Sequence, residues 1–265
     1  MPLNWIDVKD LSFNTLLLLE RQQLGWLPGW LPEPELAIAL QANPAVAWYL
    51  QHKNPQIAAW VDGVLDHAPT PSPLTPAVVR AAEEAILRSI NDLVVYAVDP
   101  EIYDRMPFLG WDDGELTGLV DFRGLTVLDI GAGTGRLAFV AAQAGAQAVF
   151  AVEPVGNLRC YIKEKARQQG LKNVFAVDGL VTDIPFPDGF ADVVMGGHVF
   201  GDEPEAEYAE MRRAVKPGGL LILCPGNNDQ DQGWHDFLVS QGCQWARFEE
   251  PGDGLKRKYW QRMAG

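Results

Sequence analysis

The chain has 265 residues, of which 48% are hydrophobic and 21% are charged, and its formal net charge is −14. This balance is typical of a globular protein with one large domain or two small ones, and it excludes collagen, coiled-coil and disordered chains. Because a surface this acidic repels phosphate groups, we expect neither nucleic acid nor an anionic membrane as a partner.

No segment of the sequence predicts membrane insertion or secretion. The longest aliphatic run near the N-terminus, Leu16–Leu19, is too short to cross a bilayer and follows no basic stretch. The three cysteines, Cys160, Cys224 and Cys243, are far apart and form no C-x-x-C pair, which argues against a disulfide framework or a zinc site. We therefore expect a cytoplasmic protein without a bound metal.

The first part of the chain predicts an all-helical region over residues 1–120. Asn43, Asn54 and Thr75 each precede a proline, a pattern typical of a capping side chain followed by the first helical residue. The longest predicted helix follows Thr75, and residues 69–76 before it are interpreted as a hinge or linker. The prolines that divide the region into short helices are Pro32, Pro34, Pro44, Pro55 and Pro76.

From about residue 121 to residue 265 the pattern alternates between strands and helices. The apolar strands are continuous, which predicts a parallel sheet covered on both faces. The turn at residues 251–254 joins the last two strands into a hairpin. The expected strands are 126–130, 148–153, 173–177, 191–195, 220–224, 244–248 and 255–261, and the expected helices are 136–143, 158–169 and 204–215.

The most informative segment is the glycine loop at residues 127–136. A strand runs into Gly131, Gly133 and Gly135 and then into a helix, and an acid, Asp129, lies two positions before the first glycine. Glycines there allow a sharp turn and a close approach of a ligand to the N–H groups of the helix start. A dinucleotide fingerprint needs G-x-G-x-x-G, but the position after Gly135 is Arg136, which disfavours a nicotinamide oxidoreductase.

Four elements in order resemble the class I S-adenosylmethionine-dependent methyltransferases, especially the small-molecule "type 11" branch. They are the loop 129–135, the acid Glu153 at the end of the second strand, the approach 184–194 to the fourth strand, and the entry 212–219 to the fifth. The resemblance implies an α/β, Rossmann-like, doubly wound sheet of seven strands with the last one antiparallel, preceded by the helical cap. It also implies that S-adenosylmethionine is consumed and S-adenosylhomocysteine released.

The resemblance assigns the cofactor site residue by residue. Glu153 is expected to accept hydrogen bonds from the ribose hydroxyls, and Asp129 to support the methionine amino group. The adenine is read either by Asp178 or by backbone groups of Leu180 and Val181, and the backbone is the alternative that we expect. The full implied set is Asp129, Gly131, Ala132, Gly133, Glu153, Pro154, Gly179, Leu180, Val181 and Gly197.

Two residues are candidates for the catalytic step. His198 follows the fourth strand, at the sheet edge where ligands bind, and can act as a general base or merely line the site. Tyr103 lies in the aromatic segment 99–111, which either closes over the cofactor or packs the cap. The expected reaction is direct methyl transfer to a small molecule; the alternatives are a protein side chain as acceptor, or a non-catalytic module that serves a partner protein.

Overall fold

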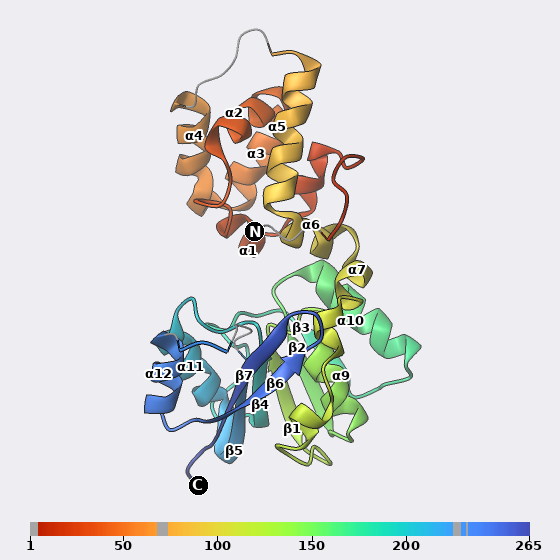
Figure 1. Ribbon diagram of the computed structural model, residues 1–265, viewed down its shortest axis with the longest axis vertical. Helices are drawn as coiled ribbons and strands as arrows, with labels where there is room; N and C mark the ends of the chain where they lie inside the picture. Colours follow the sequence, from red (N-terminus) through yellow and green to blue (C-terminus); the bar gives the residue numbers. More distant parts are fainter. Residues whose placement is uncertain (1–4, 68–73, 225–228, 232) are drawn as a thin grey trace. The chain divides into compact units, whose positions relative to one another are not determined.

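The structure is a computed structural model that describes residues 5–67, 74–224, 229–231 and 233–265. The chain divides into two compact units, residues 1–103 and residues 104–265 (Figure 1). Each unit has its own apolar core. In the described residues, no helix is both long and apolar enough to cross a membrane.

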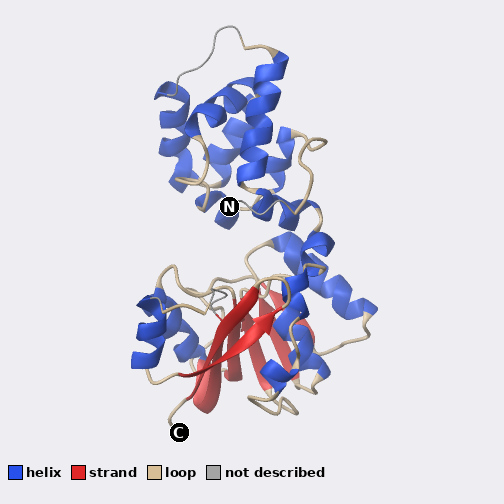
Figure 2. Ribbon diagram, viewed as in Figure 1, coloured by secondary structure: helices blue, strands red, loops and turns tan. Residues whose placement is uncertain are grey.

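The first unit is helical (Figure 2). Leu36 and Leu40 of one helix pack with Ala82 and Ile86 of another in its core. Its elements are η1 (Phe13–Leu18), α1 (Arg21–Gly25), α2 (Glu33–Ala42), α3 (Pro44–Lys53), η2 (Pro55–Ile57), α4 (Ala58–His67), α5 (Pro76–Ser89) and α6 (Asn91–Val98).

Prolines lie at the start of α2, α3, η2 and α5 as predicted, but the three expected caps differ. The side chain of Asn54 accepts a hydrogen bond from Gln56 N, and that of Thr75 accepts one from Val78 N. Asn43 makes no such bond, so this prediction is wrong. Its amide instead donates to Ala39 O and to Glu83 Oε1, because a neighbouring helix offers an acceptor that the sequence does not reveal. Residues 69–73 of the expected hinge lie outside the described residues.

The second unit is built on a seven-stranded sheet with the strand order β3-β2-β1-β4-β5-β7-β6. Strands β1 to β5 pair in parallel, and β7 is antiparallel to both of its neighbours, as the resemblance implied. The strands are β1 (Thr126–Ile130), β2 (Ala148–Val152), β3 (Val174–Val177), β4 (Ala191–Gly197), β5 (Val215–Cys224), β6 (Gln244–Glu250) and β7 (Gly254–Arg262).

Helices cover both faces of this sheet (Figure 1). Helices α9 (Arg136–Gln143) and α10 (Gly156–Gln168) share one apolar cluster with Val127 of β1. Helices α11 (Pro204–Ala214) and α12 (Gly233–Ser240) share the other cluster with Leu128. Adjacent residues of a strand therefore face opposite layers, which explains why the parallel strands are largely apolar.

The division between the units lies at residues 103/104, whereas the sequence places it at 120/121. Leu116 of α8 (Gly114–Thr117) and Phe122 are buried in the cluster that contains α9. The segment that also holds α7 (Pro100–Asp104) and η3 (Pro107–Gly110) looks like a continuation of the helical region, because its short helices carry no strand pattern. Its packing against the sheet unit decides where the boundary falls.

Candidate functional site

The glycine loop lies between β1 and α9 and closes around a buried carboxylate. Gly131, Gly133 and Gly135 have φ angles of +63°, +56° and +87°, which side chains other than that of glycine rarely adopt. A Cβ on Gly131 would lie 2.8 Å from Cβ of Val199. The shape of the loop therefore depends on glycine at these positions, and Val199, in the segment after β4, leaves no room for a side chain at Gly131.

Glu153 follows β2 and connects the loop to the next helix. Its side chain is 4% exposed, and its two oxygens accept hydrogen bonds from Gly133 N and Val155 N, both at 2.9 Å. Arg159 donates to the Glu153 carbonyl and to Asp178. A carboxylate fixed in this way at the end of a strand neighbouring the loop fits the ribose-binding role that the sequence assigns to it.

Two buried polar atoms near the loop lack a hydrogen-bond partner in the described part of the chain. They bear on whether a polar ligand fits there. They are Asp129 Oδ1 and Thr134 Oγ1, whose residues are 0% and 1% exposed. Buried polar atoms are normally paired, so each points to a donor or acceptor supplied from outside the chain. The loop, the Glu153 carboxylate and these two atoms fit S-adenosylmethionine, whose amino and hydroxyl groups are donors.

Burial raises the pKa of the Asp129 carboxyl to about 7. The hydrogen bond from Ala138 N opposes this shift, and the nearby Glu153 charge adds to it. Because the raised pKa lets the folded protein keep a proton that the unfolded chain loses, the contribution of Asp129 to stability falls as the pH rises from about 4 to about 7.

Asp129→Asn should therefore gain stability relative to wild type as the pH rises, because an amide cannot ionise. Between pH 5 and pH 8 the difference in the free energy of unfolding should grow by about 2–3 kcal/mol in favour of the variant. Urea unfolding at the two pH values measures it. Asp121→Asn is the control: the pKa of the exposed Asp121 is lowered to about 2 by Arg123, so its difference should stay constant over this range. A constant difference for Asp129→Asn would contradict the raised pKa.

The predicted adenine-binding residues lie after β3. Leu180 and Asp183 form a two-residue bridge in which Leu180 N donates to Asp183 O at 3.3 Å. Asp178 is 74% exposed and forms an ion pair with Arg159. A Cβ on Gly179 would lie 2.6 Å from Pro185 Cδ, so glycine is required for this tight turn. Pro154 lies between Glu153 and α10, and Ala132 in the glycine loop donates to Val152 O.

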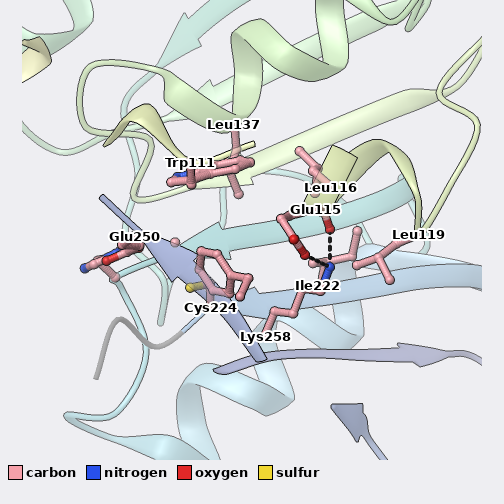
Figure 3. A pocket seen from close by; sticks show the side chains of 12 residues that line it. Trp111, Glu115, Leu116, Leu119, Leu137, Ile222, Cys224, Glu250 and Lys258 are labelled. Atoms are coloured by element: carbon pink, nitrogen blue, oxygen red, sulfur yellow. Dashed lines mark hydrogen bonds and ion pairs between the residues drawn. The ribbon is translucent and has the colours of Figure 1, made fainter. Parts of the chain in front are cut away.

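A pocket of about 410 Å³, counting space continuous with solvent, lies beyond the carboxyl ends of β4 and β5 (Figure 3). Gly197 and His198 line it at the end of β4, and Lys258 crosses it to reach Glu115 with a 2.6 Å ion pair. Ligands of open α/β sheets bind at this edge, next to the point where the strand order reverses between β1 and β4. The apolar lining comes from Trp111, Leu116, Leu119, Leu137, Ile222 and Phe248.

The two predicted catalytic residues lie in different units. His198 lines the pocket of the second unit and donates or accepts a 2.7 Å hydrogen bond between its Nε2 and Glu250 Oε1. Tyr103 belongs to the first unit, where its ring centroid lies 5.2 Å from that of Trp5 and 4.9 Å from that of Tyr96. The catalytic role of Tyr103 stays a prediction.

The sequence reasoning missed Glu250 and Cys224, which line the pocket together with His198, and Lys256, which lies beside Glu250. Ligand atoms of His198, Cys224 and Glu250 lie within 4.8 Å of one another, a set that zinc can use. Lys256 Nζ lies 4.0 Å from Glu250 Oε2, and its positive charge opposes a cation there. A usable signal existed: β6 runs in the same direction as β4, so its last residue, Glu250, reaches the same sheet edge.

Arg136 was also missed as a structural element. Arg136 is the first residue of α9, and its guanidinium donates hydrogen bonds to the carbonyls of Leu109 and Trp111. The guanidinium also forms an ion pair with Asp113 and lies 4.1 Å from the centroid of the Trp111 ring. One guanidinium thus anchors the chain segment that forms one wall of the pocket to the helix that follows the glycine loop.

Arg136→Ala should loosen this wall without unfolding the sheet. We expect a loss of about 1–3 kcal/mol and faster amide hydrogen exchange confined to residues 107–117. Arg123→Ala, which breaks an exposed ion pair with Asp121, is the matched control and should change stability by less than about 0.5 kcal/mol. Equal exchange rates in the two variants would show that Arg136 anchors nothing.

Comparison with known proteins agrees with this geometry. Residues 128–223 match the family model described as a methyltransferase domain. The chain is 31% identical over 116 residues to the histone-arginine methyltransferase CARMER of Drosophila persimilis, and 30% identical over 133 residues to that of Drosophila grimshawi. These matches cover 42% and 49% of this chain but only 22% and 24% of the relatives, so the chain spans about a quarter or less of their length.

A solved structure with a similar fold is a SAM-dependent methyltransferase of Aquifex aeolicus, which is 23% identical with a TM-score of 0.46 and covers 61% of this chain and 97% of that one. At a TM-score below 0.5 this likeness adds nothing about the substrate. The family match falls on β1 to β5, the strands that carry the glycine loop, Glu153 and the pocket edge. Residues 128–223 of the second unit match a methyltransferase domain, and this family implies S-adenosylmethionine as the cofactor.

Proposed function

We propose that the enzyme methylates a small, largely apolar molecule that binds in the pocket beyond β4 and β5. The observation that carries this proposal is the apolar lining of that pocket, which begins at Leu137, the second residue of the helix that follows the glycine loop. A concave, mostly apolar cavity with a few polar groups suits a small molecule better than an extended chain.

The cofactor is held, in this proposal, by the residues around the loop. Glu153 binds the ribose, Asp129 and the loop residues Gly131, Ala132 and Gly133 lie at the methionine end, and Gly197 leaves room beside it. Pro154 and the turn at residues 179–181 line the adenine. Because Leu180 N already donates to Asp183, Val181 is the backbone donor of that turn assigned to the adenine.

The bound cofactor supplies an electrophilic methyl group, and the chain supplies alignment. Holding two reactants in line and excluding water can lower the activation barrier by about 7–11 kcal/mol. The pocket wall that Arg136 anchors provides the exclusion on one side, and the Glu115–Lys258 ion pair joins α8 to β7 on the other. The helical unit, residues 1–103, is proposed to contribute to acceptor recognition.

A second candidate acceptor is an arginine side chain of a protein. The observation in its favour is the 31% identity to histone-arginine methyltransferases, which is confined to 42% of this chain. The family match at residues 128–223 includes the cofactor loop, which serves many acceptors, so the apolar lining of the pocket is our reason to favour the small molecule.

The test is the formation of S-adenosylhomocysteine with a panel of small phenols, amines and thiols and with an arginine-rich peptide. We expect turnover with a small apolar acceptor and none with the peptide. Leu119→Trp, which fills the pocket, should remove this turnover while the affinity for S-adenosylmethionine stays unchanged. Val239→Trp, at an exposed position of α12, is the control and should behave as wild type. Turnover of the peptide alone would overturn the small-molecule proposal.

A further inference from the structure

A buried carboxylate and a histidine meet at the edge of the pocket from two strands. Glu250 is the last residue of β6 and is 1% exposed, and His198 directly follows β4. The 2.7 Å bond between His198 Nε2 and Glu250 Oε1 joins residues that are 52 positions apart in the sequence. The fold, and not local sequence, creates this pair.

The backbone of His198 is held in a strained conformation. Its φ of +58° is the only positive value at a non-glycine residue in the part of the chain that the structure describes. Such a conformation costs about 1–3 kcal/mol and persists where the surroundings enforce it, which is common at active sites. Here His198 N donates to Cys224 O at 2.7 Å, so β5 fixes the backbone while Glu250 fixes the ring.

The charges around the pair favour one direction for the hydrogen bond between His198 and Glu250. Lys256 Nζ lies 4.0 Å from Glu250 Oε2 and 2.8 Å from Asp253, so a positive charge lies beside the buried carboxylate. For the 2.7 Å bond we therefore assign His198 Nε2 as the donor and Glu250 Oε1 as the acceptor. The lone pair of the neutral ring is then on Nδ1, and the side chain, 35% exposed, lines the pocket.

We propose that Glu250 is a positioning residue that holds His198 with Nδ1 as a proton acceptor, and that the methyl acceptor is therefore a protic nucleophile, with an O–H, N–H or S–H group. This inference rests on the proposed function. The heteroatom of the acceptor forms the bond to the methyl carbon, and the bond from that carbon to the cofactor sulfur breaks with its electron pair remaining on the sulfur. The proton of the acceptor passes to His198 Nδ1 and from there to water.

The ring of His198 can be examined without any acceptor. Nitrogen-15 NMR of histidine-labelled protein at pH 8, assigned with His198→Asn, distinguishes an Nε2–H ring from an Nδ1–H ring. We expect the Nε2–H form in wild type and in Glu250→Asp. In Glu250→Gln the amide can donate to Nε2, so the Nδ1–H form should appear. Signals of His52 and His235, which bond to Trp48 O and Tyr259 Oη, serve as internal controls and should not move.

Kinetics then test the role of the pair. With a protic acceptor, Glu250→Gln should lower kcat by about 100-fold, with a much smaller change in KM, and Glu250→Asp should restore part of it. An Nδ1–H ring in wild type, or a ring form that does not respond to Glu250→Gln, would overturn the inference, and so would an unchanged kcat. Failure of the proposed function would look different: no small acceptor would be turned over, while the NMR result would stand.

Discussion

Gly131→Ala is expected to weaken the binding of S-adenosylmethionine by at least about 100-fold. An alanine at this position would have to adopt a φ of +63°, and its Cβ would clash with the side chain of Val199. The left-handed conformation costs about 1–2 kcal/mol and the overpacking about 1–3 kcal/mol, so the loop must change its shape to accept alanine. The loop that holds the cofactor then moves, and isothermal titration calorimetry with S-adenosylmethionine measures the resulting loss of affinity.

Gly170→Ala separates the conformational strain from the effect at the site. Gly170 has a similar φ of +69° but open space where a Cβ would lie. It should lose stability by about the same conformational cost and bind the cofactor as wild type does. Adding Val199→Ala to Gly131→Ala should recover part of the affinity, because it removes the contacts with the Val199 methyl groups but leaves the close contact with its Cβ and the backbone strain. Unchanged affinity in Gly131→Ala would refute the loop assignment.

Glu153→Gln is expected to weaken cofactor binding by about 1.5–3 kcal/mol, the range for a hydrogen bond to a charged group. At about 1.4 kcal/mol for each factor of ten, this is roughly a 10- to 150-fold increase in Kd. The amide can accept a hydrogen bond from only one of the two N–H groups, of Gly133 and Val155, that the carboxylate binds, so some loss of stability accompanies the loss of affinity. Calorimetry and thermal unfolding on the same samples measure the two effects.

Asp178→Asn is the control for Glu153→Gln. Asp178 lies one strand further along, is exposed and pairs with Arg159, so its neutralisation should change neither quantity by more than a few tenths of a kcal/mol. An equally large loss of affinity in this variant would show that Asp178, and not the backbone of the following turn, reads the adenine. Loss of stability with unchanged affinity in Glu153→Gln would show that Glu153 is only structural.

The sheet could be predicted from the sequence because its signals are local. Each parallel strand is an apolar run followed by glycine or a helix signal, and β1 (Thr126–Ile130) and α9 (Arg136–Gln143) begin and end where the pattern places them. The antiparallel end follows from the turn at residues 251–254. The longer β5 was only half predicted, since Lys216–Gly219 carries turn residues, Gly218 has a φ of +74°, and the register with β4 shifts at this point.

The cofactor loop was predictable for the same reason, but the pocket was not. Gly131, Glu153 and the turn after β3 each follow a strand directly, so the direction of the strands places them at one edge. Glu250 and Lys258 reach that edge because β7 of the predicted hairpin pairs with β5, and no short pattern specifies which strand the hairpin joins. The contacts of Arg136 with the carbonyls of Leu109 and Trp111 join segments about 25 residues apart and have no sequence signature.

The most direct test of the central assignment is calorimetric titration of the purified protein with S-adenosylmethionine, S-adenosylhomocysteine and NADH in parallel. The loop geometry, the buried Glu153 and the family match predict micromolar binding of the first two and no binding of NADH. Gly131→Ala, titrated beside wild type, should lose the signal. Binding of NADH alone, or binding of S-adenosylmethionine that survives Gly131→Ala unchanged, would contradict the assignment.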